Sequence, residues 1–504
     1  MSDEKTSPAV EPTEHTAAPT HTPAGRPTGW MHKGFRVAGH EFWYASPIVQ
    51  LVMVALVCFL CPGMFNALGG LGAGGQVDAT AQNNASTALY SVFAVVAFFS
   101  GTIVNTLGVK LTLSFGGLGY CIYAASFLSY NHNENFGFVI FAGAFLGLCA
   151  GLLWTAQGTI MMSYPHEEKK GRYIALFWII FNMGAVIGSL IPLGQNINST
   201  GTGPVNDGTY VGFIVLMFVG AVLALFLVNA SSVIRDDGSK VILMKNPSWK
   251  TEFQGLIDTI TQAPWVILLF PMFFASNTFY TYQQNDFNGA HFNTRTRALN
   301  NTLYWTSQIL GAIVFGYGLD YGKARRSVRA KVSFIALSVV MLVVWGGGWD
   351  WQRKQAPREV VESKTVQYVG YDWTDGGDKF IGPMFLMMFY GFFDAAWQTS
   401  IYWYMGALSN SGRKAANLAG FYKGIQSAGA AVFWALDGTK QPYNTMFGAT
   451  WGLVTGALIF AAPVIWLKIK DTVTIEEDLK FSDETVADVA PTSVVVTQRK
   501  EEEA

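Results

Sequence analysis

Charged residues are scarce in this sequence. Only 13% of its 504 residues are Asp, Glu, Lys or Arg, whereas 51% are hydrophobic; ordinary soluble domains carry about a quarter charged residues. The formal net charge of −1 offers no basic face, so no nucleic-acid partner is expected. Because the apolar residues are too many for a water-facing surface, we expect a lipid bilayer around the protein.

Cysteines are few, and chemical motifs are missing. The four cysteines lie in apolar runs without charged neighbours, which argues against a disulfide framework and a zinc site. The sequence has no nucleophile–base set and no strand–loop–helix motif for a nucleotide. We therefore expect no enzymatic activity, no cofactor and no metal site.

Long hydrophobic runs are abundant instead. A bilayer core of about 30 Å needs roughly 20 apolar residues per helix. Runs of this kind predict membrane helices near residues 46–68, 85–107, 111–130, 136–163, 173–193, 209–230, 263–282, 299–319, 332–349, 380–408, 418–436 and 445–468. The predicted fold is an all-α integral membrane bundle of about twelve helices in two six-helix halves.

The longest connection between predicted spans divides the chain. The predicted domains are a solvated, disordered tail, a six-helix half, a linker, a second six-helix half and a second tail, at residues 1–44, 45–230, 231–262, 263–469 and 470–504. Apolar residues from Trp249 to Ile260 recur at helical spacing, which indicates an amphipathic helix in the linker. It lies on the inner membrane surface or packs on the bundle as an ordinary surface helix.

Basic residues orient the predicted helices. Lys and Arg gather in alternate connections, and cytoplasmic loops retain such residues, so both termini are expected in the cytoplasm. Two glycosylation sequons, at Asn84 and Asn198, then fall on the outer side. The sequence does not identify the membrane.

A loop pattern recurs at matching places in the two halves. It comprises Gly101, Asn105, Gly108 and Lys110 after the second span, and Gly316, Asp320, Arg325 and Arg326 after the eighth. Both copies resemble the inner-loop motif of major facilitator transporters, Gly-x-x-x-Asp-x-x-Gly-Arg-Arg, whose charges latch helices on the cytoplasmic side. The first copy departs from it at Asn105 and Val109. The alternative is a generic positive loop on the inner side.

Two further stretches carry a closer resemblance. Residues 61–72, CPGMFNALGGLG, and residues 421–429, FYKGIQSAG, resemble the Unc-ninety-three-like branch of that superfamily in a fungal form. The resemblance implies the fold, and it implies either transport or the regulation of channels or of receptor trafficking. We expect Gly70, Gly72 and Gly75 to let the outer end of the first helix unwind beside a cavity.

Only two charged side chains fall inside the predicted spans away from their ends. Asp394 lies near the middle of the tenth, with Gln398 one turn away, and burial favours a neutral acid that takes up and releases a proton. It either serves a substrate or proton site or is a structural partner for another helix. Lys423 either extends to the cytoplasmic surface or pairs with Asp394, and Gln426 shares its helix face.

Uncharged polar and aromatic residues complete the candidate site. They are Asn66, Trp154, Gln157, Asn182, Asn277, Tyr280 and Gln308. The resemblance implies that the first, fourth, seventh and tenth helices line a central cavity, where most of this set converges. The alternative for each residue is an ordinary hydrogen bond between helices.

Two functions follow from this reading. The first is a transporter that moves a small polar or weakly cationic solute, with or without a proton, by alternating access. The second is a non-transporting regulatory or trafficking subunit for a channel or another membrane protein.

Overall fold

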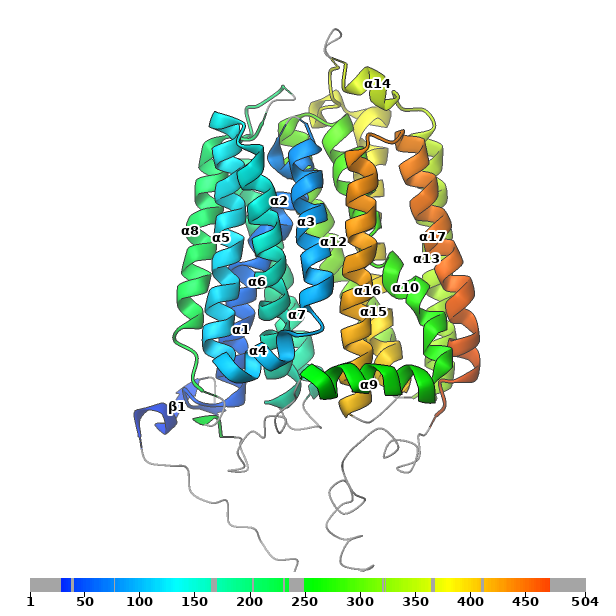
Figure 1. The fold of residues 1–504 in the computed structure, drawn as a ribbon. Helices are drawn as coiled ribbons and strands as arrows, with labels where there is room; N and C mark the ends of the chain where they lie inside the picture. The colour runs from blue at the N-terminus through cyan, green and yellow to red at the C-terminus, as the bar shows by residue number, and fades with distance from the viewer. Residues whose placement is uncertain are drawn as a thin grey trace, which may run out of the picture.

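The computed structural model describes residues 29–471 except 38–39, 77, 165–169, 202–203, 230–231, 235–248, 320, 322, 364–367 and 409–411. This part of the chain is a bundle of long helices that run between two end faces (Figure 1). Helix α9 (Trp249–Gln262) lies across one end, and the short helix α14 (Arg358–Val361) caps the other. We call these ends the α9 face and the α14 face.

Eight helical segments of the described chain are long and apolar enough to cross a membrane. They are Pro47–Gly69 (α1, Pro47–Leu60, and α2, Pro62–Gly69), Val109–Asn133 (α5), Phe136–Gly158 within α6 (Phe136–Ser163), Leu176–Gln195 within α7 (Lys170–Gln195), Asp207–Ala224 (α8), Arg326–Gln352 (α13), Lys379–Leu408 within α15 (Gly377–Leu408) and Tyr443–Leu467 (α17). The prediction of an all-α, multi-pass integral membrane protein is confirmed at this level.

The other four predicted spans are built differently. The second is broken into α3 (Thr80–Val96) and α4 (Ser100–Leu107). The seventh consists of short pieces: the 3-10 helix η5 (Pro264–Leu269), α10 (Phe270–Ala275), α11 (Phe279–Thr281) and the π-helix η6 (Tyr282–Gly289). The eighth and eleventh are the long helices α12 (Thr294–Leu319) and α16 (Gly412–Gly438), which carry polar residues along their length.

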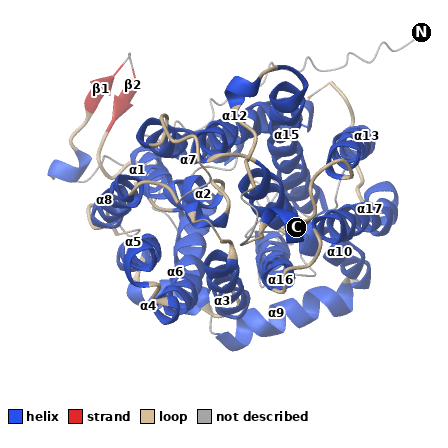
Figure 2. Ribbon diagram, turned by 90° about the horizontal axis from the view of Figure 1, so that it is seen from above, coloured by secondary structure: helices blue, strands red, loops and turns tan. Residues whose placement is uncertain are grey.

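The buried apolar side chains form two clusters. One runs from Trp43 to Val233 and adds Ala298, so it belongs mainly to α1–α8. The other runs from Ala263 to Ile469 and adds Ala185, so it belongs mainly to α10–α17. Helix α16 packs on α3 and helix α12 packs on α7, which joins the two groups of helices (Figure 2).

A small amount of β-structure precedes the first span, where the sequence predicts a disordered tail to residue 44. Strands β1 (Phe35–Val37) and β2 (His40–Phe42) pair antiparallel, after a 3-10 helix at Trp30–His32. Phe35 and Phe42 are directly opposite, with ring centroids 6.1 Å apart. Cross-strand aromatic pairs of this kind stabilise a hairpin, so ordered structure begins earlier than predicted.

Candidate functional site

Asp394 is a buried carboxyl group with four hydrogen-bonding neighbours inside the bundle. It lies on α15 and is completely buried. Its Oδ2 accepts hydrogen bonds from the hydroxyls of Tyr280 (2.7 Å) and Tyr304 (3.1 Å) and from the Gln308 amide, and its Oδ1 faces the Gln398 amide at 3.4 Å. The Tyr280 hydroxyl and the two amides donate to Asp394, whereas the single proton of the Tyr304 hydroxyl is shared between Asp394 and Gln283 Oε1 (3.0 Å). These hydrogen bonds stabilise the charged carboxylate, whereas burial favours the neutral acid.

Two glutamines connect Asp394 to Lys423. The Lys423 ammonium donates to Gln426 Oε1 (3.1 Å), and Gln426 Nε2 donates to Gln398 Oε1 (3.2 Å). Gln398 Nε2 in turn faces Asp394 Oδ1. Every amide dipole in this row therefore points from the cation toward the anion, so each bond polarises the next. Asn277 closes the row from the side, since its Oδ1 accepts from Gln426 (2.8 Å).

Three aromatic rings surround the Lys423 ammonium. Its Nζ lies 5.3 Å from the Tyr422 ring centroid, 5.5 Å from Trp154 and 5.7 Å from Tyr402, all within the range of cation–π attraction. Tyr422 and Tyr402 belong to α16 and α15, whereas Trp154 belongs to α6. The cage therefore takes one wall from the α1–α8 group.

The structure brings most of the predicted site residues together. One network, here the central network, contains Asn277, Tyr280, Gln308, Asp394, Gln398, Lys423 and Gln426, with Trp154 against it. Within the described residues no direct hydrogen bond or ion pair joins Lys423 to Asp394. The Lys423 side chain is half-buried, and its ammonium group lies among aromatic rings instead of extending to the cytoplasmic surface.

Three candidates lie apart from the central network. Gln157 contacts Met161 on its own helix, with 3.4 Å between Nε2 and Sδ. Among the described residues no hydrogen bond links Asn66 or Asn182 to Asp394 or its partners. Conversely, Tyr304 and Tyr422 belong to the network and were not predicted, because a tyrosine in an apolar run looks like packing until its hydroxyl has a partner.

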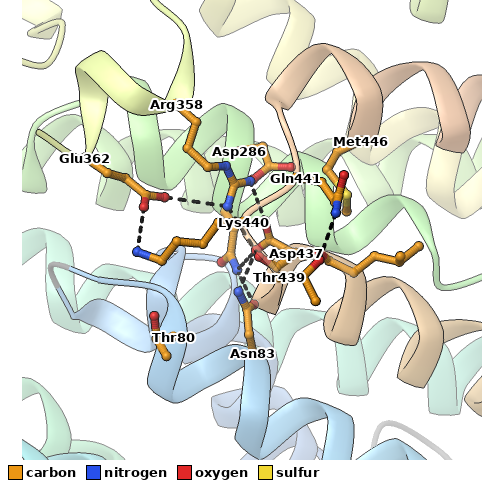
Figure 3. A network of polar contacts seen from close by, with 12 residues as sticks. Thr80, Asn83, Asp286, Arg358, Glu362, Asp437, Thr439, Lys440, Gln441 and Met446 are labelled. Atoms are coloured by element: carbon orange, nitrogen blue, oxygen red, sulfur yellow. Dashed lines mark hydrogen bonds and ion pairs between the residues drawn. The ribbon is translucent and has the colours of Figure 1, made fainter.

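A second polar cluster lies at the α14 face and was also not predicted (Figure 3). We call it the α14-face cluster: Asn83, Asn285, Asp286, Arg358 and Asp437. All five side chains are at least 95% buried. Arg358 Nη2 donates to Asp286 Oδ1 (2.6 Å) and to Asp437 Oδ1, and Asn83 donates to Asp437 Oδ2 (2.7 Å). Since Asn83 belongs to α3 and Asp437 to α16, the cluster links the two groups of helices.

The segment after α2 is held against the α10–α17 group at the same face. Arg297 of α12 donates to the carbonyls of Leu71 (2.7 Å) and Gly72 (2.6 Å). Asn288 donates to the Gly70 carbonyl (2.9 Å), and Asn301 to the Ala67 carbonyl (2.6 Å). The expected unwinding is therefore present, and its freed carbonyl groups are satisfied by the facing helices.

The predicted loop pattern lies at the α9 face. Gly101 and Asn105 fall in α4, Gly108 precedes α5 with φ +78°, and Lys110 is in the first turn of α5. In the second copy Gly316 is in α12, Arg325 precedes α13 and Asp320 lies outside the described residues. Arg326 reaches the Ala407 carbonyl at the end of α15 (3.5 Å), so it connects two helix ends.

The two sequons differ in their surroundings. Asn198 is exposed in the connection between α7 and α8. Asn84 lies within α3, where its amide donates to the Thr80 carbonyl at 2.8 Å.

Comparison with known proteins finds relatives that share the name UNC93. Residues 73–345 match the family described as "Ion channel regulatory protein UNC-93". The chain is 50% identical to an UNC93-like protein of Schizosaccharomyces pombe over 452 residues, 90% of this chain and 88% of that protein. It is 42% identical to UNC93-like protein 1 of Arabidopsis thaliana over 86% of this chain and 93% of the relative. UNC93-like protein MFSD11 of Xenopus laevis is 26% identical over 138 residues, 27% of this chain and 30% of that protein.

Proposed function

The chain belongs to the UNC-93 family, and we propose that it moves a small polar solute across the membrane by alternating access. In this proposal residues 45–230 and 263–469 are two six-helix halves that rock around a central site. The two hydrophobic clusters support the division, since each group of helices has a core of its own. The name of one relative, MFSD11, fits a chain of the major facilitator type.

The central network is the observation that carries the proposal. A charged residue deep in a membrane costs several kcal/mol unless it has partners or serves a pathway. This chain holds both an anion and a cation there, and its Lys423 cage takes a wall from each half. Sites at the contact between two halves are where alternating-access carriers bind their solutes. A purely structural bundle needs neither charge.

The chemistry of the central network suggests the solute. Asp394 accepts from four donors, and a cationic or hydrogen-bonding group that replaced one of them would keep the carboxylate satisfied. A small polar or weakly cationic molecule has such groups, and a proton can accompany it by neutralising Asp394.

We place the α9 face in the cytoplasm. The described part of the chain begins and ends at this face, where β1 and the end of α17 lie (Figure 1). Arg325, Arg326 and Lys331 are near it, and positive residues remain on the cytoplasmic side. The amphipathic helix α9 then borders the inner membrane surface, and Asn198 faces the outside.

Uptake into proteoliposomes tests the transport proposal. Uptake from a pooled metabolite mixture is measured with and without an imposed proton gradient. The purified chain is expected to accumulate at least one solute. Asp394→Asn is expected to lower that uptake roughly 10- to 100-fold, since hydrogen bonds to a charged group are worth about 1.5–3 kcal/mol. Asp350→Asn is the matched control, because Asp350 is exposed at the end of α13.

Either of two results would contradict the proposal. One is full uptake by Asp394→Asn; the other is no uptake of any solute by protein that is folded and inserted in one orientation. The second result favours a regulatory subunit, a role consistent with the description of the family. Under that alternative, loss of the chain changes a membrane conductance in cells, although the purified chain transports nothing.

A further inference from the structure

The charges of the α14-face cluster do not balance. It holds one guanidinium, that of Arg358, between the carboxyl groups of Asp286 and Asp437. At its rim Glu362 pairs with Lys440 at 2.8 Å and lies 3.5 Å from Arg358 (Figure 3). With both aspartates ionised, the buried part carries one excess negative charge. Such a charge is costly where water is excluded.

Two buried atoms of the cluster also lack partners. In the described part of the chain, Asp286 Oδ2 and Arg358 Nε have no hydrogen-bond partner, although Asp286 is only 1% exposed. Asp286 Oδ1 and Asp437 Oδ1 both accept from the same nitrogen, Arg358 Nη2, so the two carboxyl groups are close neighbours. Two neighbouring carboxylates repel each other, and a proton on one of them removes the repulsion. A single proton supplies the missing donor and removes the excess charge.

We propose that Asp286 binds one proton when the α14 face closes. The inference rests on the alternating-access function, since it needs the two halves to separate at this face. When they separate, Asn83 leaves Asp437 and water reaches the aspartates. An exposed aspartate gives up its proton near pH 4, about three units below neutral. The closed state therefore binds the proton more tightly than the open state does.

The groups around Asp286 favour the binding of one proton there. Burial acts to lower the pKa of Arg358, but the negative charges of Asp286 and Asp437 outweigh it and raise that pKa, so the guanidinium stays charged. Asp286 also faces Glu362 of the α14 segment, and the Tyr443 ring of α17 stacks 4.4 Å from the Arg358 guanidinium carbon. From α3 the cluster meets the neutral amide of Asn83. None of these neighbours neutralises the second aspartate.

The direction of coupling follows from mass action. A proton that binds the closed form more tightly favours closure when the pH falls, and the ratio of closed to open molecules changes by up to about tenfold per pH unit. Asp286→Asn removes the excess charge permanently. This variant is expected to stay closed at every pH.

Distance measurements between spin labels on the two halves test the proposal. Labels at Asn133→Cys and Asn444→Cys lie on exposed residues at the α14 face, and the four native cysteines are buried. In lipid nanodiscs without solute, the short-distance population of the otherwise natural chain is expected to fall as the pH rises from about 5 to about 8. Asp286→Asn should abolish this change, and Glu362→Gln, at the exposed rim, should retain it.

The outcomes separate this inference from the transport proposal. A pH-independent distance in the natural chain, or an unchanged pH response in Asp286→Asn, overturns the proton site, while solute uptake would still support transport. A pH response that Asp286→Asn removes supports the site even if no solute is ever found. Loss of the response in Glu362→Gln would assign the proton to the rim and overturn the proposal.

Discussion

Replacing Arg358 by leucine is expected to destabilise the protein by about 3–5 kcal/mol, the usual cost of leaving a buried charge without its partner. Arg358 is 5% exposed, and its single guanidinium donates to two buried carboxyl groups. Thermal unfolding in detergent, followed by tryptophan fluorescence, measures the loss. Arg353→Leu is the control, because Arg353 is exposed and pairs with exposed Asp350, and such surface pairs contribute about 0–1 kcal/mol.

A double variant distinguishes lost charge pairing from lost packing. If the cost comes from uncompensated carboxylates, Asp286→Asn in the Arg358→Leu background should restore part of the stability. If the two substitutions are additive, or if Arg358→Leu melts like the natural chain, the electrostatic account of the cluster is wrong.

Gly72→Ala is expected to prevent the α14 face from closing and to cost about 2–5 kcal/mol in the closed state, as the sum of backbone strain and overpacking. Gly72 has φ +74°, and a Cβ there would collide with the Gln284 carbonyl and lie 2.6 Å from the Gly289 Cα. Both neighbours are backbone of η6 and its end, so they cannot turn aside. The spin-label pair should then report the long distance at every pH.

Gly108→Ala is the matched control for this substitution. Gly108 has nearly the same backbone conformation, φ +78°, but an added Cβ meets nothing within 4 Å. Gly108→Ala therefore costs only the backbone strain, about 1–2 kcal/mol, and should leave the distance between the labels unchanged. A short distance in Gly72→Ala, or equal effects of the two alanines, would contradict the role given to the segment after α2.

The sequence predicted the parts of the fold that depend on apolar length. Most runs near 20 residues became long helices, since a bilayer leaves the backbone no other partner than its own helix. The spacing of Asp394 and Gln398 correctly placed both on one face of α15, where they meet. Helical periodicity settles which residues share a face, so this part of the site needed no tertiary information.

The α14-face cluster was missed for a physical reason. Polar residues end an apolar run, so the predicted spans stopped at residues 282 and 436, just before Asp286 and Asp437. Their partners Asn83 and Arg358 come from distant parts of the chain, and only tertiary packing brings them together. The run QQNDFN, residues 283–288, was a usable signal, because its five polar residues beside a membrane helix need buried partners.

Asn66, Gln157 and Asn182 were predicted to belong to the site but lie apart from the central network. Each is a polar residue on a helix that the family resemblance assigns to the cavity, but sequence spacing cannot say toward which neighbour a helix turns its polar residue. Hydrogen bonds between helices average about 0.6 kcal/mol, too little to fix that rotation against the packing of a whole helix.

The presence of Asp394 and Lys423 in one network has an electrical consequence. When Asp394 is ionised, its negative charge and the positive charge of Lys423 sum to zero, so the empty carrier proposed above moves almost no net charge through the membrane field as it rocks between its two states. A transmembrane voltage, worth about 2.3 kcal/mol per elementary charge and 100 mV, then acts mainly on what enters the site. The net charge moved in each turnover would then equal the charge of the solute plus that of any proton carried with it.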